Sequence, residues 1–124
     1  MKKLFASVPM RGRTEEEIRE NFAKMKRIAE AYEGEELELI DTWIAEEPPE
    51  DVENQGVWYL GKSLEMLSTA DVFIGVETHE RFMGCEVENH VAYKYGIPTY
   101  FVEPENVFKD WREIIRKGIK ATVK

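Results

Sequence analysis

Cysteine, histidine and long apolar runs are scarce in this sequence of 124 residues, and each scarcity excludes a class of protein. The chain has one cysteine, Cys85, which excludes an internal disulfide and favours a reducing, cytoplasmic compartment. Its two histidines, His79 and His90, have no companions at metal-ligand spacing, so we expect neither a metal nor another cofactor. No stretch approaches the roughly 18 apolar residues of a membrane span. The apolar run at residues 4–8 is too short for a signal peptide.

Positive charge is also in short supply, because 17 Lys and Arg residues face 25 Asp and Glu residues, for a net charge of −8. Duplex nucleic acid and anionic membranes bind basic surfaces, so we expect neither as a partner. A small phosphorylated ligand held by a few local arginines remains compatible with this charge. The hydrophobic content of 43% is sufficient for the core of a single domain spanning residues 1–124.

Short apolar runs alternate with amphipathic segments along the chain. The apolar runs predict strands at residues 4–8, 37–40, 72–76 and 98–102. The amphipathic segments predict helices at residues 14–34, 57–68, 85–95 and 107–119. Thr14 and Glu17 have the spacing of a capping box, and Gly34 is a stop signal for the first helix. In the third helix, Val87, Val91 and Tyr95 share one face.

Alternation of strands and helices with short connections predicts an α/β fold with right-handed crossovers and a parallel sheet. The expected architecture is a flavodoxin-like (Rossmann-like) three-layer sandwich with four to five strands in the order 2-1-3-4. That order reverses between the first and third strands, and ligands bind beyond the carboxyl ends of the strands at such a point. We therefore expect residues 8–13, residues 77–84 and the start of the third helix to surround one ligand site.

Glu88 and Cys85 lie near the start of this third helix. A helix N-terminus favours negative charge, so Glu88 is expected to stay ionised and to be available as a nucleophile or base. Acidic residues are common in first turns for the same reason, so a purely structural role stays open. Cys85 is either a thiol with a lowered pKa or, as we favour, a small buried residue.

Arg11 and Arg13 flank Gly12 just before the first helix. Backbone N–H groups at a helix start, together with a guanidinium, can hold a phosphate. Alternatively, the two arginines pair with the Glu-rich start of that helix. Asp71 precedes the third strand, where an Asp is more often a structural hydrogen-bonding residue than a catalytic one.

Three segments resemble the nucleoside 2-deoxyribosyltransferase superfamily, which includes the deoxynucleoside 5'-monophosphate N-glycosidases. Residues 4–12 are similar to the family's opening strand and loop, with Arg11 and Gly12 as in the monophosphate hydrolases. Residues 64–72 resemble the helix end and the Asp before the third strand. The spacing of Gly84, Glu88 and Gly96 resembles the frame around the family's catalytic Glu. The resemblance covers roughly residues 3–102.

The resemblance implies that Glu88 attacks the anomeric carbon of a (deoxy)ribosyl group, after which water or a second base resolves the intermediate. The implied catalytic positions are Glu88, Asp71 and Ser63. The implied substrate-binding positions are Phe5, Ser7, Pro9, Met10, Arg11, Gly12, Arg13, Phe82, Met83 and Gly84. A homodimer or higher homo-oligomer is implied too, and the aromatic residues that suit its interface are Tyr93, Tyr95, Trp58 and Trp111.

Three of these positions depart from the family pattern. Phe5 replaces a Tyr, Ser63 replaces an acidic residue, and Phe82 replaces an Asp or Ser. General acid–base assistance typically contributes about 10²–10⁴ in rate, so these changes bear on function. The leading hypothesis is an N-glycosidase or glycosyltransferase acting on a (deoxy)nucleoside 5'-monophosphate. The alternative is a non-catalytic nucleotide or nucleotide-sugar binding module, and a purely structural subunit is a third interpretation.

Overall fold

The computed structural model describes residues 1–10, 13–77 and 83–107. Its four strands are β1 (Lys3–Ser7), β2 (Glu38–Leu39), β3 (Val72–Val76) and β4 (Thr99–Val102), and its helices are α1 (Glu15–Glu33), α2 (Gln55–Leu67) and α3 (Met83–Lys94). A short 3-10 helix, η1 (Pro104–Asn106), follows β4. All strand pairs are parallel, and the order β2-β1-β3-β4 confirms the predicted flavodoxin-like topology. The predicted last helix lies outside the described residues from position 108 onward.

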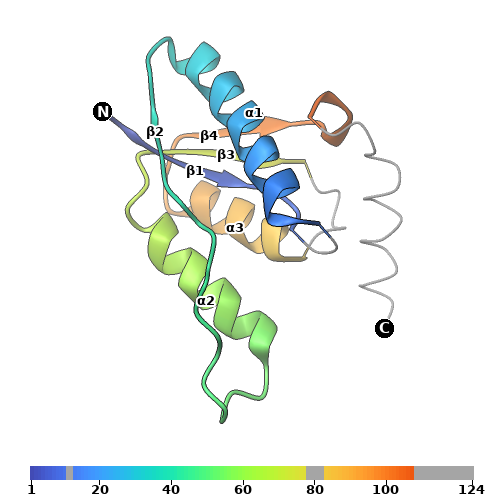
Figure 1. Cartoon of the computed structure of the whole chain (residues 1–124). Helices are drawn as coiled ribbons and strands as arrows, with labels where there is room; N and C mark the ends of the chain where they lie inside the picture. Colours follow the sequence, from blue (N-terminus) through green and yellow to red (C-terminus); the bar gives the residue numbers. More distant parts are fainter. Residues whose placement is uncertain (11–12, 78–82, 108–124) are drawn as a thin grey trace.

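Helix α1 covers one face of the sheet, and α2 and α3 lie on the other (Figure 1). On the α1 face, Leu4 and Ala6 of β1 belong to a core that includes Phe22 of α1. On the opposite face, Phe5 stacks on Phe73 with ring centroids 5.8 Å apart. Side chains alternate between the faces of a strand, so Ser7 points to the same side as Phe5, toward α2 and α3.

The predicted ends of α1 are confirmed. The Thr14 hydroxyl accepts a hydrogen bond from the Glu17 N–H and donates one to the Glu17 carboxylate, both at 3.2 Å. At the other end, Gly34 has φ +73° and its N–H donates to the Glu30 carbonyl at 2.8 Å. Only glycine adopts this backbone conformation without strain, so the helix ends where the sequence predicts.

The apolar face of α3 is not the face that is most deeply buried. Val87 is 36% exposed and Tyr95 is 81% exposed, whereas Cys85, Glu88 and Ala92 are buried. These three buried residues follow one another at helical spacing, in agreement with the predicted helix. An apolar pattern alone does not indicate this face, because its central member is a carboxylic acid.

The first half of α2 extends away from the sheet, with residues 40–54 running beside it (Figure 1). Val57 near the start of α2 is 62% exposed, whereas Leu67 at the other end of α2 is buried. Residues 40–54 form neither helix nor strand, and they include Pro48 and Pro49, which cannot continue a helix or a central strand. In the described part of the chain, no helix has the length and apolar character needed to span a bilayer.

Candidate functional site

Glu88 of α3 and Ser7 at the carboxyl end of β1 form the centre of the candidate site. The Ser7 hydroxyl donates a hydrogen bond of 2.7 Å to Glu88 Oε1, joining two elements that are far apart in the sequence. Glu88 is 9% exposed, and no other acidic side chain of the described residues is buried. A carboxylate removed from water in this way is expensive for the fold, so its position calls for a functional explanation.

Gly75 of β3 makes this close approach of α3 possible. It pairs with Ser7 in the sheet and therefore faces α3 as well. A Cβ built on Gly75 would overlap Asn89 Oδ1 and would lie 2.7 Å from Phe73 Cε1. Asn89 in turn donates a hydrogen bond from Nδ2 to the Val76 carbonyl at 3.2 Å. Gly75 and Asn89 thus hold α3 against the sheet, directly beside Glu88.

Burial raises the pKa of Glu88, and hydrogen bonds with Ser7 and Ser63 oppose that increase. The net direction is opposite to the expectation that a helix N-terminus keeps this residue ionised. Two structural facts explain the difference: Glu88 lies beyond the first turn of α3, and its side chain is largely removed from water. The carboxylate is therefore poorly solvated, and a positive charge that develops beside it is strongly stabilised.

Cys85 occupies the same buried face of α3. The pKa of its thiol is raised to about 12, mainly by burial and to a smaller extent by the negative charge of Glu88. The side chain is 6% exposed. The structure therefore supports the interpretation of Cys85 as a small buried residue and not as a reactive thiolate.

The three residues predicted to be catalytic do not come together. Ser63 of α2 is near enough to Glu88 to affect its pKa through a hydrogen bond. Asp71, by contrast, lies at the amino end of β3, where its carboxylate accepts a hydrogen bond of 2.8 Å from the Lys3 N–H. Ser7 and Glu88 lie at the other end of the same sheet, so Asp71 has a structural role in joining β3 to β1.

The predicted binding residues divide in a similar way. Ser7 lies in the site, and Gly84 is exposed in the first turn of α3 with open space around it. Phe5 is 1% exposed and packs in the core against Phe73, so its predicted ligand contact stays a prediction. Pro9 is buried, and Met10 packs against the core on the α1 side of the sheet.

The arginine loop is only partly described. Arg13 has a nitrogen 3.1 Å from a Glu17 carboxylate oxygen, which supports pairing with the Glu-rich start of α1 for this residue. The predicted positions Arg11, Gly12 and Phe82 lie outside the described residues, and so does the side chain of Met83. Within the part of the chain that the structure describes, His, Cys, Asp and Glu side chains form no group of three that could hold a metal ion.

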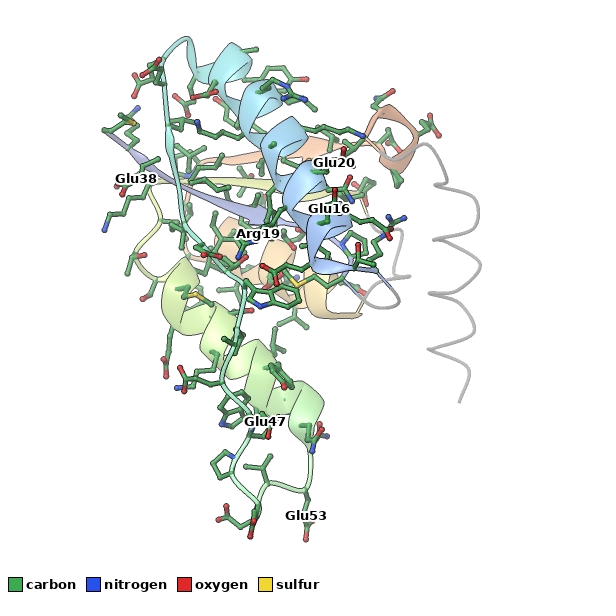
Figure 2. The ribbon with its side chains drawn as sticks, in the orientation of Figure 1. Glu16, Arg19, Glu20, Glu38, Glu47 and Glu53 are labelled. Atoms are coloured by element: carbon green, nitrogen blue, oxygen red, sulfur yellow. The ribbon has the colours of Figure 1, made fainter. Side chains whose placement is uncertain are left out.

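Most acidic side chains differ from Glu88 in being on the surface. Glu16 and Glu20 lie along α1, and Glu47 and Glu53 lie on the segment that precedes α2 (Figure 2). Arg19 lies near the acidic residues of this surface, with a nitrogen 2.7 Å from Glu15. Such solvent-exposed charges contribute little to stability and are the usual form of an acid-rich surface. Burial alone therefore distinguishes Glu88 from the other carboxylates of the described chain.

Comparison of the chain with models of known protein families, with curated proteins and with solved structures gives no match in any of the three. The family resemblance noted from residues 3–102 therefore stays a prediction.

Proposed function

We propose that the protein is an N-glycosidase or glycosyltransferase that acts on a (deoxy)nucleoside 5'-monophosphate, with Glu88 as its nucleophile. The observation that carries this proposal is the buried Glu88 carboxyl group, held by the Ser7 hydroxyl at 2.7 Å. Its position at the carboxyl end of β1 agrees with the place where ligands bind in this topology.

The proposed reaction has two displacement steps at the anomeric carbon. In the first, a Glu88 oxygen bonds to this carbon as the N-glycosidic bond breaks and its electron pair leaves with the base, which takes up a proton from solvent. In the second, water or another base attacks the same carbon, the bond from that carbon to Glu88 breaks to release the carboxylate, and the attacking group gives up its proton to solvent. Both transition states resemble an oxocarbenium ion, whose positive charge is stabilised by a carboxylate in a poorly hydrated site.

The Ser7 hydroxyl has a defined part in this scheme. It orients Glu88 through Oε1 and partly offsets the cost of burying the charge. The 5'-phosphate is proposed to bind at Arg11 and Gly12, just before the N-terminus of α1, where backbone N–H groups favour anions. Family resemblance supports this part of the proposal.

Chromatographic detection of free base tests the reaction. The protein is incubated with a panel of ribo- and deoxyribonucleoside 5'-monophosphates, with and without an added second base as acceptor. We expect base release by the wild type and a loss of roughly 10³-fold or more in Glu88→Gln, because this change removes the proposed nucleophile. Glu86→Gln is the matched control, because it removes the same charge from the same helix at a less buried position. No base from any nucleotide, or equal release by wild type and Glu88→Gln, contradicts the proposal.

A non-catalytic nucleotide or nucleotide-sugar binding module is the second candidate. Two observations favour it: Phe5 offers no hydroxyl and is buried in the core, and Asp71 lies at the far end of β3. The interactions that shift the pKa of Glu88 involve two hydroxyl groups and no second acid. This function predicts nucleotide binding that persists in Glu88→Gln, weakens in Arg11→Ala and is accompanied by no base release.

The cellular setting and the assembly belong to the same proposal. We propose a cytoplasmic homodimer or higher homo-oligomer that binds neither duplex nucleic acid nor membranes. Two of the aromatic side chains predicted for its interface, Tyr93 and Tyr95, are 68% and 81% exposed in the single chain. Trp58 is only half-buried, and Trp111 lies outside the described residues.

A further inference from the structure

Thr42, in the segment that follows β2, has a buried hydroxyl group without a partner. Its side chain is 3% exposed, and Oγ1 has no hydrogen-bond partner among the described residues. Two other buried polar atoms share this property, Asn21 Nδ2 and Asn89 Oδ1. Native proteins keep few such groups because each forfeits the hydrogen bonds that water would have made. An unpaired buried hydroxyl that is retained therefore indicates a missing partner.

The register between β1 and β2, extended beyond the end of β2 at Leu39, leads to a position for Thr42 beside Ser7. The ladder pairs Leu4 with Leu39, and it continues with the Ile40 N–H donating to the Leu4 carbonyl at 2.9 Å. The same register carried further along the two chains brings Ile40 beside Phe5 and Thr42 beside Ser7. Ile40 does pack against the core cluster that contains Phe5, in agreement with this register.

The alternation of side chains after β2 supports the same placement. Leu39 packs on the α1 side, Ile40 on the side of α2 and α3, and Asp41 again toward α1. The Asp41 carboxylate lies 3.6 Å from a nitrogen of Arg19, which is labelled on α1 in Figure 2. Thr42 is next in this alternation and so belongs to the face that carries Ser7 and Glu88.

The chain turns away from the sheet immediately after this point. The Trp43 N–H donates to Asp41 Oδ1 at 3.1 Å, which forms an Asx turn centred on Thr42. The segment then continues toward α2, where Lys62 lies 4.0 Å from Glu46. The turn thus positions Thr42 at the carboxyl edge of the sheet. Of the other two unpaired atoms, Asn21 Nδ2 lies on α1. Asn89 Oδ1 lies on α3 and faces Gly75, and its side chain already bonds the Val76 carbonyl through its nitrogen.

We infer that Thr42 is a ligand-binding residue of the Glu88 site, whose hydroxyl group is reserved for a hydroxyl of the ligand's sugar. A threonine hydroxyl both donates and accepts a hydrogen bond, which matches a sugar hydroxyl group. With Ser7 on the adjacent strand, Thr42 extends a polar edge alongside the carboxylate that is to react with the anomeric carbon. This inference rests on the proposed function, because the sugar is that of the proposed nucleotide.

The test compares Thr42→Val, which keeps the shape and removes the hydroxyl, with Thr42→Ser, which keeps the hydroxyl. Calorimetric binding is measured in the Glu88→Gln background, so that the ligand is not consumed, with nucleoside 5'-monophosphates and with ribose 5-phosphate. We expect Thr42→Val to bind both kinds of ligand roughly tenfold more weakly, the loss of about one hydrogen bond. Thr42→Ser retains the affinity. Thermal unfolding without ligand is expected to show an unchanged or higher Tm for Thr42→Val.

Each contrary result has a separate meaning. One such result is a nucleotide that binds with equal affinity to the Glu88→Gln protein with and without Thr42→Val. That result overturns the inference and leaves the proposed function standing. Weaker binding of nucleotides with unchanged binding of ribose 5-phosphate overturns the assignment to the sugar. A fall in the Tm of Thr42→Val by more than about 4 °C shows that the hydroxyl already has a partner in the folded protein and overturns the inference too. If none of these ligands binds to the Glu88→Gln protein that retains Thr42, the proposed function and this inference are both overturned.

Discussion

Substitution of Glu88 by glutamine tests the electrostatics of the site through the stability of the fold. Glutamine keeps the size of the side chain and an oxygen that accepts the hydrogen bond from Ser7, but it carries no charge. Burial raises the pKa of Glu88 above its ordinary value of 4.5. The charged form of Glu88 therefore weakens the folded state relative to the neutral form.

The direction and size of the effect follow from proton linkage. The unfolded chain releases the Glu88 proton near the ordinary value of 4.5, whereas the folded protein releases it only at a higher pH. The stabilisation from the bound proton is complete below the unfolded pKa and is lost as pH rises through the folded pKa. Between these two values the wild type loses about 1.4 kcal/mol for each unit of pH relative to Glu88→Gln.

Urea unfolding of the wild type and Glu88→Gln over about pH 4 to pH 8 measures this difference, because groups common to both proteins largely cancel. We expect the free energy of unfolding of Glu88→Gln to exceed that of the wild type by an amount that grows with pH and then levels off. The control Glu86→Gln removes a charge from a less buried position on α3, and we expect it to change stability by less than about 0.5 kcal/mol. Two results would refute the assignment of the raised Glu88 pKa to burial. One is a stability difference between Glu88→Gln and the wild type that does not change with pH, and the other is a Glu88→Gln protein that is less stable than the wild type at neutral pH.

Two further predictions concern the packing around Glu88. Gly75→Ala forces a methyl group against Asn89 and Phe73 and is expected to destabilise the fold by about 1–3 kcal/mol in urea unfolding. Gly61→Ala in α2 is its control, because no atom lies within 4 Å of the added carbon, and equal effects of the two changes would contradict the packing argument. With a pKa raised to about 12, the Cys85 thiol is expected to resist a thiol-specific disulfide reagent at pH 8 in the folded protein and to react once urea unfolds it. Rapid labelling of the folded protein would contradict its burial.

Local patterns in the sequence predicted the elements of the fold well. The apolar run of β3 matches the predicted residues 72–76, and the cap residues of α1 act as their spacing indicates. These features depend on neighbours along the chain, such as the hydrogen bond between Thr14 and the Glu17 N–H. The strand order also followed, because short right-handed connections leave few arrangements of four parallel strands.

The site was predicted less completely. The sequence indicated Glu88 and Ser7, and the structure shows that they contact each other. It did not indicate Gly75, Asn89 or Thr42, although a glycine within an apolar strand is a known sign of close backbone approach. It also grouped Asp71 with Glu88, which the structure separates by the length of β3.

Sequence alone thus determined the order of the strands and helices of the described residues, the ends of α1 and the strand order of the sheet, because periodicity and caps are interactions over a few residues. Only the tertiary structure decided which face of α3 is buried, and hence that Glu88 is removed from water beside Ser7. The pKa of Glu88 shows why this matters, since position on a helix favours the charged form and burial favours the neutral one. The balance between these two effects depends on residues that are distant from Glu88 in the sequence, such as Ser7 and Ser63. Only folding brings these residues close to Glu88.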